Sequence, residues 1–180
     1  MAMASELPSI YSFPPLYTRQ PNSLIRAQQL DAWLGVLKDY ARGGRVWIMG
    51  RDGSAREPKG EGSVFVNEQL QRRVPGPFVD EIWAHAVANG AALRHSADSF
   101  YVLWRSLDSW SALLLQWFET CGRLNEVVTI YELVAGDEAS SWEFHGMHEG
   151  LCELALGKLV ERGRATLISS DGSVVAVKVI

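Results

Sequence analysis

The fold is decided by two stretches of the chain, GAALRHSADSFYV at residues 90–102 and GRATLISSDGSVV at residues 163–175. Each starts with a glycine, the residue that most easily ends a helix in the left-handed conformation. Each continues as two short segments around a polar turn, which is typical of a β-hairpin. An offset of 73 residues superimposes Gly90 on Gly163, Ala92 on Ala165, Asp98 on Asp171 and Val102 on Val175. The two stretches therefore predict one structural unit that occurs twice.

Helical patterns precede the second stretch. Residues 107–121 place apolar side chains at the spacing of an amphipathic helix, namely Trp110, Leu113, Leu114, Trp117, Phe118 and Cys121. A short apolar segment follows at residues 127–134. A longer helix is expected over residues 147–162, with its inward side chains at Leu151, Leu154, Leu159 and Val160. The order is thus helix, short helix, helix and hairpin, with the hairpin turned at Asp171-Gly172.

A similar order precedes the first stretch. Asn22 or Ser23 is suited to cap a helix, and an apolar stripe follows at Leu30, Trp33, Leu34, Leu37 and Ala41. Residues 46–49 predict a short strand, residues 64–73 a short helix, and residues 77–89 a helix with Phe78, Ile82 and Ala86 on one face. The Gly-rich residues between Arg51 and Ser63 predict a flexible loop without a site.

Three helices closed by a two-stranded wing form a winged helix, an elaborated helix-turn-helix. We therefore predict a mostly α protein with small β-hairpins, an α+β fold of two tandem winged-helix domains. An N-terminal arm would occupy residues 1–22, the first domain residues 23–105 and the second domain residues 106–180. The short junction predicts a rigid pair of domains.

The arm carries the segment Phe13-Pro14-Pro15-Leu16-Tyr17. Adjacent prolines fix φ and lack backbone donors, so the segment favours an extended polyproline II conformation. A stiff segment loses little entropy on docking, and Tyr17 adds a large ring with a polar tip. The arm is therefore a candidate docking peptide, with two alternatives: it folds back on its own domain, or it frays. Residues 1–12 are expected to be disordered.

Composition limits the function classes. Of the 180 residues 47% are apolar and seven are Trp, which suffices for packed cores, and the net charge of −4 disfavours a nucleic-acid binder. We expect Cys121 and Cys152, which both fall in helical apolar patterns, to be buried, reduced thiols. Neither a signal peptide nor a membrane-spanning run is evident, so we expect a cytoplasmic protein that reaches membranes only through partners.

Winged helices often bind DNA, but the first candidate reading helix offers Asp80, Glu81 and His85 instead of basic side chains. Catalysis is also disfavoured. His148 and Cys152 lie four residues apart, yet further zinc ligands at the usual spacing are missing, and neither cysteine has a nucleophile signature. We expect no catalytic residue, metal ion or cofactor. The remaining class is a protein–protein interaction module.

The chain also carries a series of short segments that match a known family in order and spacing. They are Pro14-Pro15-Leu16-Tyr17, Gln20-Pro21-Asn22, Gln29-Leu30, Ala32-Trp33, Leu70-Gln71-Arg72, Leu103-Trp104-Arg105, Trp110, Gln116-Trp117, Thr129-Ile130-Tyr131-Glu132-Leu133 and Glu143-Phe144-His145-Gly146. With them the chain resembles, from about residue 13 to its end, the small winged-helix subunits of the endosomal sorting complex ESCRT-II, the vacuolar protein sorting-associated protein 25 family. The loop between Arg51 and Ser63 departs from the family, because it is longer and richer in glycine.

The resemblance implies a non-enzymatic subunit, present in two copies, one on vacuolar protein sorting-associated protein 22 and one on protein 36. The family's Pro-Pro-x-Phe/Tyr docking motif transfers to Pro14, Pro15, Leu16 and Tyr17. The family's second winged helix recruits protein 20 of ESCRT-III to endosomes, for sorting ubiquitinated cargo into multivesicular bodies. Its surface transfers only as the region 127–180, with Tyr131, Glu132, Phe144 and His145 as candidates.

Two alternatives stay open from the sequence. Pro-Pro-x-Tyr is also a ligand of WW domains, so the chain could be an adaptor that presents Tyr17 to such a domain. A winged-helix nucleic-acid binder is the other alternative. The sequence also leaves open whether the free protein forms a homodimer and what the loop between Arg51 and Ser63 does.

Overall fold

The computed structural model describes residues 7–180, and the expectation of disorder for residues 1–6 lies outside the described residues. The chain divides into two compact units between Trp104 and Arg105. Each unit combines helices with a small antiparallel sheet that includes a terminal hairpin, so both are winged helices in an α+β fold. Among the described residues, no helix has both the length and the apolar character that a membrane span requires.

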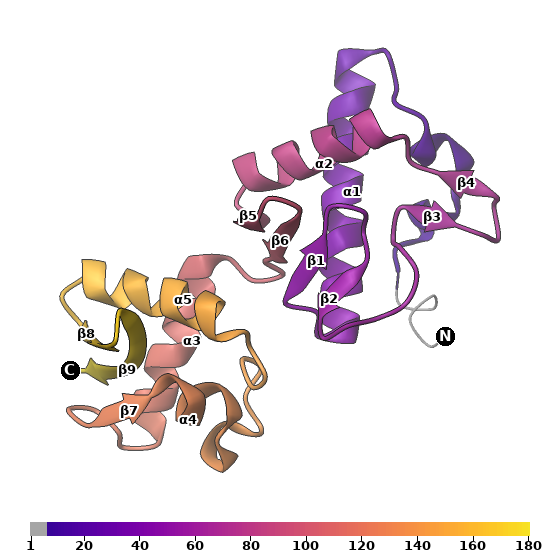
Figure 1. Cartoon of the computed structure of the whole chain (residues 1–180). Coiled ribbons are helices and arrows are strands. Elements are labelled where there is room, and N and C mark those ends of the chain that lie inside the picture. Colours follow the sequence, from indigo (N-terminus) through magenta and orange to yellow (C-terminus); the bar gives the residue numbers. More distant parts are fainter. Residues whose placement is uncertain (1–6) are drawn as a thin grey trace. The chain divides into compact units, whose positions relative to one another are not determined.

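Unit 1 is built on a long helix and a four-stranded sheet. Its elements are η2 (Ser9–Ser12), η3 (Pro14–Tyr17), α1 (Ser23–Gly44), β1 (Ile48–Gly50), β2 (Ala55–Glu57), β3 (Val66–Asn67), β4 (Arg72–Arg73), α2 (Gly76–Ala88), β5 (Ala92–Ser96) and β6 (Ser99–Val102). The sheet has the order β2-β1-β6-β5, with every neighbouring pair antiparallel. The hairpin β3–β4 lies apart from this sheet, beside the N-terminal turns (Figure 1).

Local chemistry explains how α1 begins and packs. The Asn22 side chain accepts hydrogen bonds from the backbone N–H groups of Leu24 and Ile25, which confirms the expected N-cap. All five members of the predicted apolar stripe are buried. In the same core, the ring of Trp83 in α2 stacks on the ring of Phe100 in β6, with the ring centroids 4.4 Å apart. The helices and the wing of unit 1 therefore share one apolar core.

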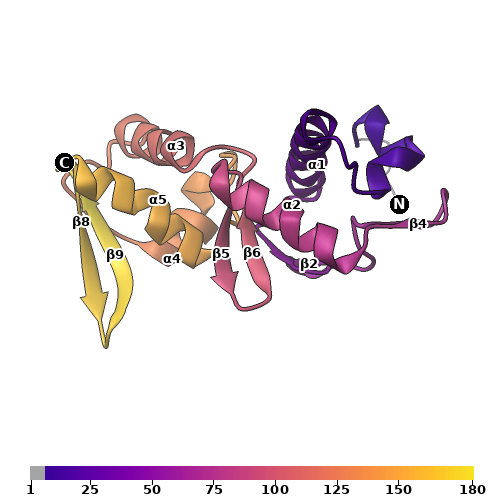
Figure 2. The ribbon, with the colours of Figure 1, turned by 90° about the horizontal axis from the view of Figure 1, so that it is seen from above.

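Unit 2 follows the expected order more closely. Its elements are α3 (Leu107–Thr120), β7 (Val127–Thr129), α4 (Ile130–Ala135), η4 (Asp137–Ala139), α5 (Glu149–Glu161), β8 (Ala165–Ser170) and β9 (Ser173–Val179). The sheet has the order β7-β9-β8, and β8 and β9 form the long hairpin seen in Figure 2. Asp171 and Gly172 both have positive φ, 51° and 81°, as a tight two-residue turn requires.

The short helix predicted over residues 64–73 is wrong, because the chain there forms the hairpin β3–β4. Val64-Phe65-Val66 is a run of β-branched and aromatic residues that suits extended backbone. Val64 and Phe65 are buried in the core of unit 1, and the N–H of Val74 donates to the carbonyl of Phe65. Unit 1 therefore has two long helices, α1 and α2, where three helices were expected.

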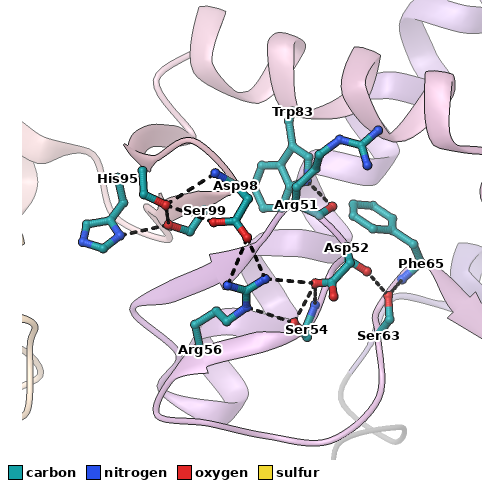
Figure 3. Close-up of polar contacts among 11 residues, drawn as sticks. Arg51, Asp52, Ser54, Arg56, Ser63, Phe65, Trp83, His95, Asp98 and Ser99 are labelled. Atoms are coloured by element: carbon teal, nitrogen blue, oxygen red, sulfur yellow. Dashed lines mark hydrogen bonds and ion pairs between the residues drawn. The ribbon is translucent and has the colours of Figure 1, made fainter.

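The segment between Arg51 and Ser63 is also more regular than predicted. It contains β2, which pairs with β1, and its Ala55 side chain is buried. Figure 3 shows how polar contacts hold it: Arg56 reaches Asp98 in the wing turn, and the Ser63 hydroxyl donates to the carbonyl of Asp52. Because both ends of the segment are tied down, the expectation of a flexible loop is corrected to an ordered excursion of the sheet.

In α5 the inward face was predicted only in part. Leu151 and Leu159 are fully buried, but Leu154 and Val160 are 44% and 40% exposed. The other buried residues of α5 are Cys152, Ala155 and Leu156. Leu151 therefore lies at the edge of the buried face and not at its centre. At about 100° per residue, Leu154 and Val160 fall outside that face.

Candidate functional site

The segment that carries the expected docking motif is folded, not extended. Residues 14–17 form the 3-10 turn η3, in which the N–H of Leu16 donates to the carbonyl of Phe13 over 3.0 Å. The two prolines occupy the first positions of the turn, where a missing N–H costs nothing. Residues 9–12 form a similar turn, η2. The predictions of polyproline II for the motif and of disorder for residues 9–12 are therefore wrong.

Tyr17 and Leu16 point into unit 1, where they are 1% and 3% exposed. The Tyr17 hydroxyl donates to the carbonyl of Tyr11 over 2.7 Å and accepts from the Asn67 side-chain amide at 3.0 Å. Its ring meets the rings of Tyr11 and Trp33 edge-on. Burial raises the pKa of Tyr17, so the phenol stays neutral. These two motif residues belong to the core, so the alternative in which the arm folds back on its own domain is the one observed.

The backbone of the motif is held by polar side chains of α1. The Gln29 side-chain N–H donates to the carbonyls of Pro15, Leu16 and Thr18, at 3.2, 3.0 and 2.7 Å. The indole N–H of Trp33 donates to the carbonyl of Leu16 at 3.0 Å. The sequence contained a signal for this role, because Gln29 is a polar residue four positions before Trp33 in the buried stripe. A stripe of apolar residues predicts packing alone and does not indicate what a polar residue within it binds.

What the motif leaves on the surface is an apolar patch. Phe13 is 53% exposed, and Pro14 and Pro15 are also exposed. Beside them lies a hollow of about 320 Å³, called here the apolar hollow. It is lined by Ile10, Phe13, Pro15, Leu16, Gln20, Ile25, Gln28, Gln29 and Ala32. Phe13, Pro14 and Pro15 thus form part of the protein surface. Leu16 and Tyr17 are buried and anchor the turn that carries them.

A basic hairpin borders the motif. Arg72 and Arg73 form β4, which contacts η3, and both side chains are exposed. Within the described residues, neither guanidinium lies within 4.0 Å of a carboxylate. The sequence showed both arginines but placed them in a helix, so their position beside the motif could not be foreseen. We call residues 66–73 the arginine hairpin.

The four candidate residues in unit 2 do not lie on one surface. Tyr131 is 69% exposed on α4, and Glu132 follows it with a half-exposed side chain. Phe144 is fully buried, which corrects its assignment as a surface residue, and His145 is half-buried. Phe144 packs beside Trp142 in an irregular segment. Its burial could not be predicted because that segment has no periodic pattern.

Glu132 also belongs to an ion-pair cluster around Arg123. The guanidinium lies 2.6 Å from Glu126, 3.2 Å from Glu132 and 2.7 Å from Glu138, and it faces the ring of Trp117. The hydrogen bonds that Arg123 donates to Glu126 and Glu132 raise the pKa of its guanidinium. This cluster, called here the Arg123 cluster, joins the turn after α3 to α4 and η4.

Cys152 and His148, the residues considered for catalysis and metal binding, have roles in packing and helix capping. Cys152 is fully buried, and burial raises the pKa of its thiol well above the ordinary range, which disfavours a thiolate. The ring Nδ1 of His148 accepts from the N–H of Gly150 and caps α5. Over residues 7–180, no three His, Cys, Asp or Glu side chains gather closely enough to hold a metal ion.

The face of α2 that was tested for DNA binding carries carboxylates in ion pairs. Glu81 pairs with Arg19 and Arg26, and Asp80 with Arg51. The hydrogen bond from Arg51 lowers the pKa of Asp80, so this carboxylate stays ionised. These ion pairs engage Arg19, Arg26 and Arg51 with carboxylates of the protein, so the three guanidiniums are not available for a phosphate backbone.

Comparison with known proteins gives consistent matches. The family model described as ESCRT-II complex subunit matches residues 10–148. Vacuolar protein-sorting-associated protein 25 of Saccharomyces cerevisiae is 41% identical, with 98% of this chain and all of that protein covered. A crystal structure of subunit VPS25 matches with a TM-score of 0.89 at 43% identity, covering 97% of this chain and 99% of that one. A chain of the ESCRT-II crystal structure with VPS22, VPS25 and VPS36 matches with a TM-score of 0.86, at 43% identity, over 98% of this chain and all of that one.

Proposed function

The chain belongs to the family of ESCRT-II complex subunits, and from this premise we propose that it is the small, non-enzymatic subunit of that complex. In this proposal unit 1 docks onto the two larger subunits, vacuolar protein sorting-associated proteins 22 and 36, with one copy on each. A solved ESCRT-II complex to which the chain is similar contains VPS22 and VPS36 beside VPS25.

The exposed Phe13 beside the apolar hollow is the observation that carries the proposal. An aromatic side chain next to a preformed depression is the usual form of a binding hot spot. The hydrogen bonds of Gln29 and Trp33 hold the backbone of the turn, so the surface is organised before the partner arrives. Preorganisation lowers the entropy cost of binding. Phe13, Pro14 and Pro15 would contact the partner, while Leu16 and Tyr17 would fix the shape of the turn.

The arginine hairpin gives this surface a charged rim. Arg72 and Arg73 are exposed beside η3, and they suit carboxylates on the docking partner. Rim charges mainly accelerate encounter and select partners, so they would contribute less to affinity than the apolar contact at Phe13.

Unit 2 would then serve the second step. We propose that its surface around Tyr131 and Glu132, within residues 127–180, recruits protein 20 of ESCRT-III. With two copies in one complex, two such surfaces would raise the effective concentration of ESCRT-III subunits. The result would be ESCRT-III assembly on endosomal membranes and the sorting of ubiquitinated cargo into multivesicular bodies, with membrane contact through partners alone.

The proposal is tested with two aromatic substitutions that act as controls for each other. Phe13→Ala should weaken binding of the full chain to co-purified proteins 22 and 36 by roughly 30-fold, as expected for loss of a hot-spot side chain. Tyr131→Ala should leave that binding unchanged but weaken capture of protein 20. Calorimetry and a pull-down measure the two affinities. Wild-type binding of Phe13→Ala to proteins 22 and 36 would refute the docking surface, and wild-type capture of protein 20 by Tyr131→Ala would refute the recruitment surface.

A further inference from the structure

A second hollow lies on the other side of the N-terminal turns. It has a volume of about 750 Å³ and is lined by residues of three segments: the N-terminal turns, α1, and the chain from residue 61 to residue 69. Two tyrosines, Tyr11 and Tyr40, and two acidic residues, Glu61 and Glu68, are among the residues that line it. None of the described residues that line it is a lysine, arginine or histidine. We call it the acidic hollow.

The walls of the acidic hollow are held in place. The Tyr11 hydroxyl donates to the carbonyl of Val64 at 2.8 Å, and the Asn67 side-chain amide donates to the carbonyl of Tyr11 at 3.2 Å. Ser63, which also lines the hollow, is bonded to Asp52 (Figure 3). The cavity therefore exists without a ligand.

The charges of the hollow are unbalanced. Within the described part of the chain, neither Glu61 nor Glu68 forms an ion pair. Glu68 stands at the turn of the arginine hairpin and lines a smaller hollow together with Arg72 and Arg73, whereas Glu61 lines the acidic hollow and not the smaller one. Two carboxylates beside two phenol rings suit a cationic side chain, which gains both ion pairing and cation–π attraction.

One turn of the chain separates the acidic hollow from the apolar hollow. Ile10 and Phe13 line the apolar hollow, while their neighbours Tyr11 and Ser12 line the acidic hollow. A partner that covers Phe13 therefore reaches the acidic hollow across a single turn of chain. Glu61 comes from the Gly-rich excursion between Arg51 and Ser63, whose role the sequence left open.

We propose, on the basis of the proposed function, that the acidic hollow receives a lysine or arginine side chain of the ESCRT-II subunit that docks at Phe13. The excursion between Arg51 and Ser63 then acts as a specificity determinant, because it supplies one of the two carboxylates. A partner without a basic side chain at that position would leave both carboxylates unpaired in the interface.

The test uses the full chain titrated into co-purified proteins 22 and 36. The double variant Glu61→Gln/Glu68→Gln should bind about fivefold more weakly at about 50 mM salt, as expected for two exposed ion pairs. The loss should shrink at about 300 mM salt because screening weakens such pairs. The reversal Glu61→Lys/Glu68→Lys should cause a larger loss. The matched control Glu57→Gln/Glu119→Gln removes two exposed carboxylates outside the hollow and should bind as wild type.

Each outcome decides the proposal. Wild-type binding of Glu61→Gln/Glu68→Gln at both salt concentrations, or an equal loss in the control, would overturn it. If Phe13→Ala loses binding while Glu61→Gln/Glu68→Gln does not, the acidic hollow is rejected and the docking surface stands. If Glu61→Gln/Glu68→Gln loses binding while Phe13→Ala does not, the shared partner site is rejected. Thermal unfolding checks that each variant is folded.

Discussion

The two units solve the same packing problem with different parts of the chain. In unit 2 the short helix α4 follows the first strand and buries Ile130, Leu133 and Val134. In unit 1 no helix takes that place among the described residues, and its core gains Leu16 and Tyr17 from the N-terminal turns instead. The comparison teaches that a winged helix tolerates the loss of one helix when another segment supplies the apolar side chains.

The largest expected loss of stability comes from truncating one large buried ring in the core of each unit. Tyr17→Ala should destabilise unit 1, and Phe144→Ala should destabilise unit 2, each by about 3–5 kcal/mol, because a large buried ring is lost. Hydrogen exchange resolved by segment would measure each unit separately. If Tyr17→Ala leaves the protection of α1 and α2 unchanged, the arm is not part of the core of unit 1.

Tyr17→Phe refines that measurement, because it removes only the hydroxyl. The carbonyl of Tyr11 and the amide of Asn67 would each lose this partner but stay hydrogen-bonded to each other. A cost of about 0.5–1.5 kcal/mol is therefore expected. A loss as large as that of Tyr17→Ala would mean that the hydroxyl, and not the ring, accounts for most of the stabilisation.

The intermediate effect tests the Arg123 cluster of unit 2. Arg123→Met keeps an apolar stem near Trp117 but leaves Glu126, Glu132 and Glu138 without their shared cation. We expect a loss of about 1–2 kcal/mol, more than a single exposed pair contributes, because three carboxylates depend on one guanidinium. Urea unfolding at low and high salt measures it. A loss below about 0.3 kcal/mol would reduce the cluster to ordinary surface pairs.

The smallest effect tests the corresponding charges of unit 1. The pKa of Asp80 is lowered by Arg51, so this pair stabilises the folded state above the ordinary carboxyl pKa, and the contribution is lost as pH falls through the lowered value. Asp80→Asn should cost about 0.5 kcal/mol at pH 7 because the pair is exposed. Unfolding at pH 7 and near pH 2 should show the difference between variant and wild type vanish in acid. A difference that persists in acid would point to packing instead of charge.

The sequence predicted best what is decided within a few residues. The Asn22 cap, the helix from Leu107 and the turn at Asp171-Gly172 all follow from local preferences, and the structure has each of them. Prediction from the sequence failed where residues distant in the chain determine the local structure. The run from Val64 to Val66 suits extended backbone, but the burial of Val64 and Phe65 in a core that includes Trp33 depends on distant residues.

The candidate site divides in the same way. The motif at residues 14–17 was visible in the sequence, but the distribution of its side chains between surface and core was not. That distribution depends on Gln29, Trp33 and Asn67, which approach the motif only after folding. The position of the arginine hairpin could not be predicted for a related reason. Arg72 and Arg73 lie beside the motif only because β4 pairs with β3.

The burial of Tyr17 affects how strongly a WW domain could bind the Pro-Pro-x-Tyr segment. A WW domain grips the tyrosine ring itself, so it would first have to pull this side chain out of the protein interior and disconnect it from Asn67. The free energy of that local opening is subtracted from whatever affinity the isolated peptide has. Folding thereby makes the Pro-Pro-x-Tyr segment a poor ligand for a WW domain, while the Phe13 side chain stays exposed.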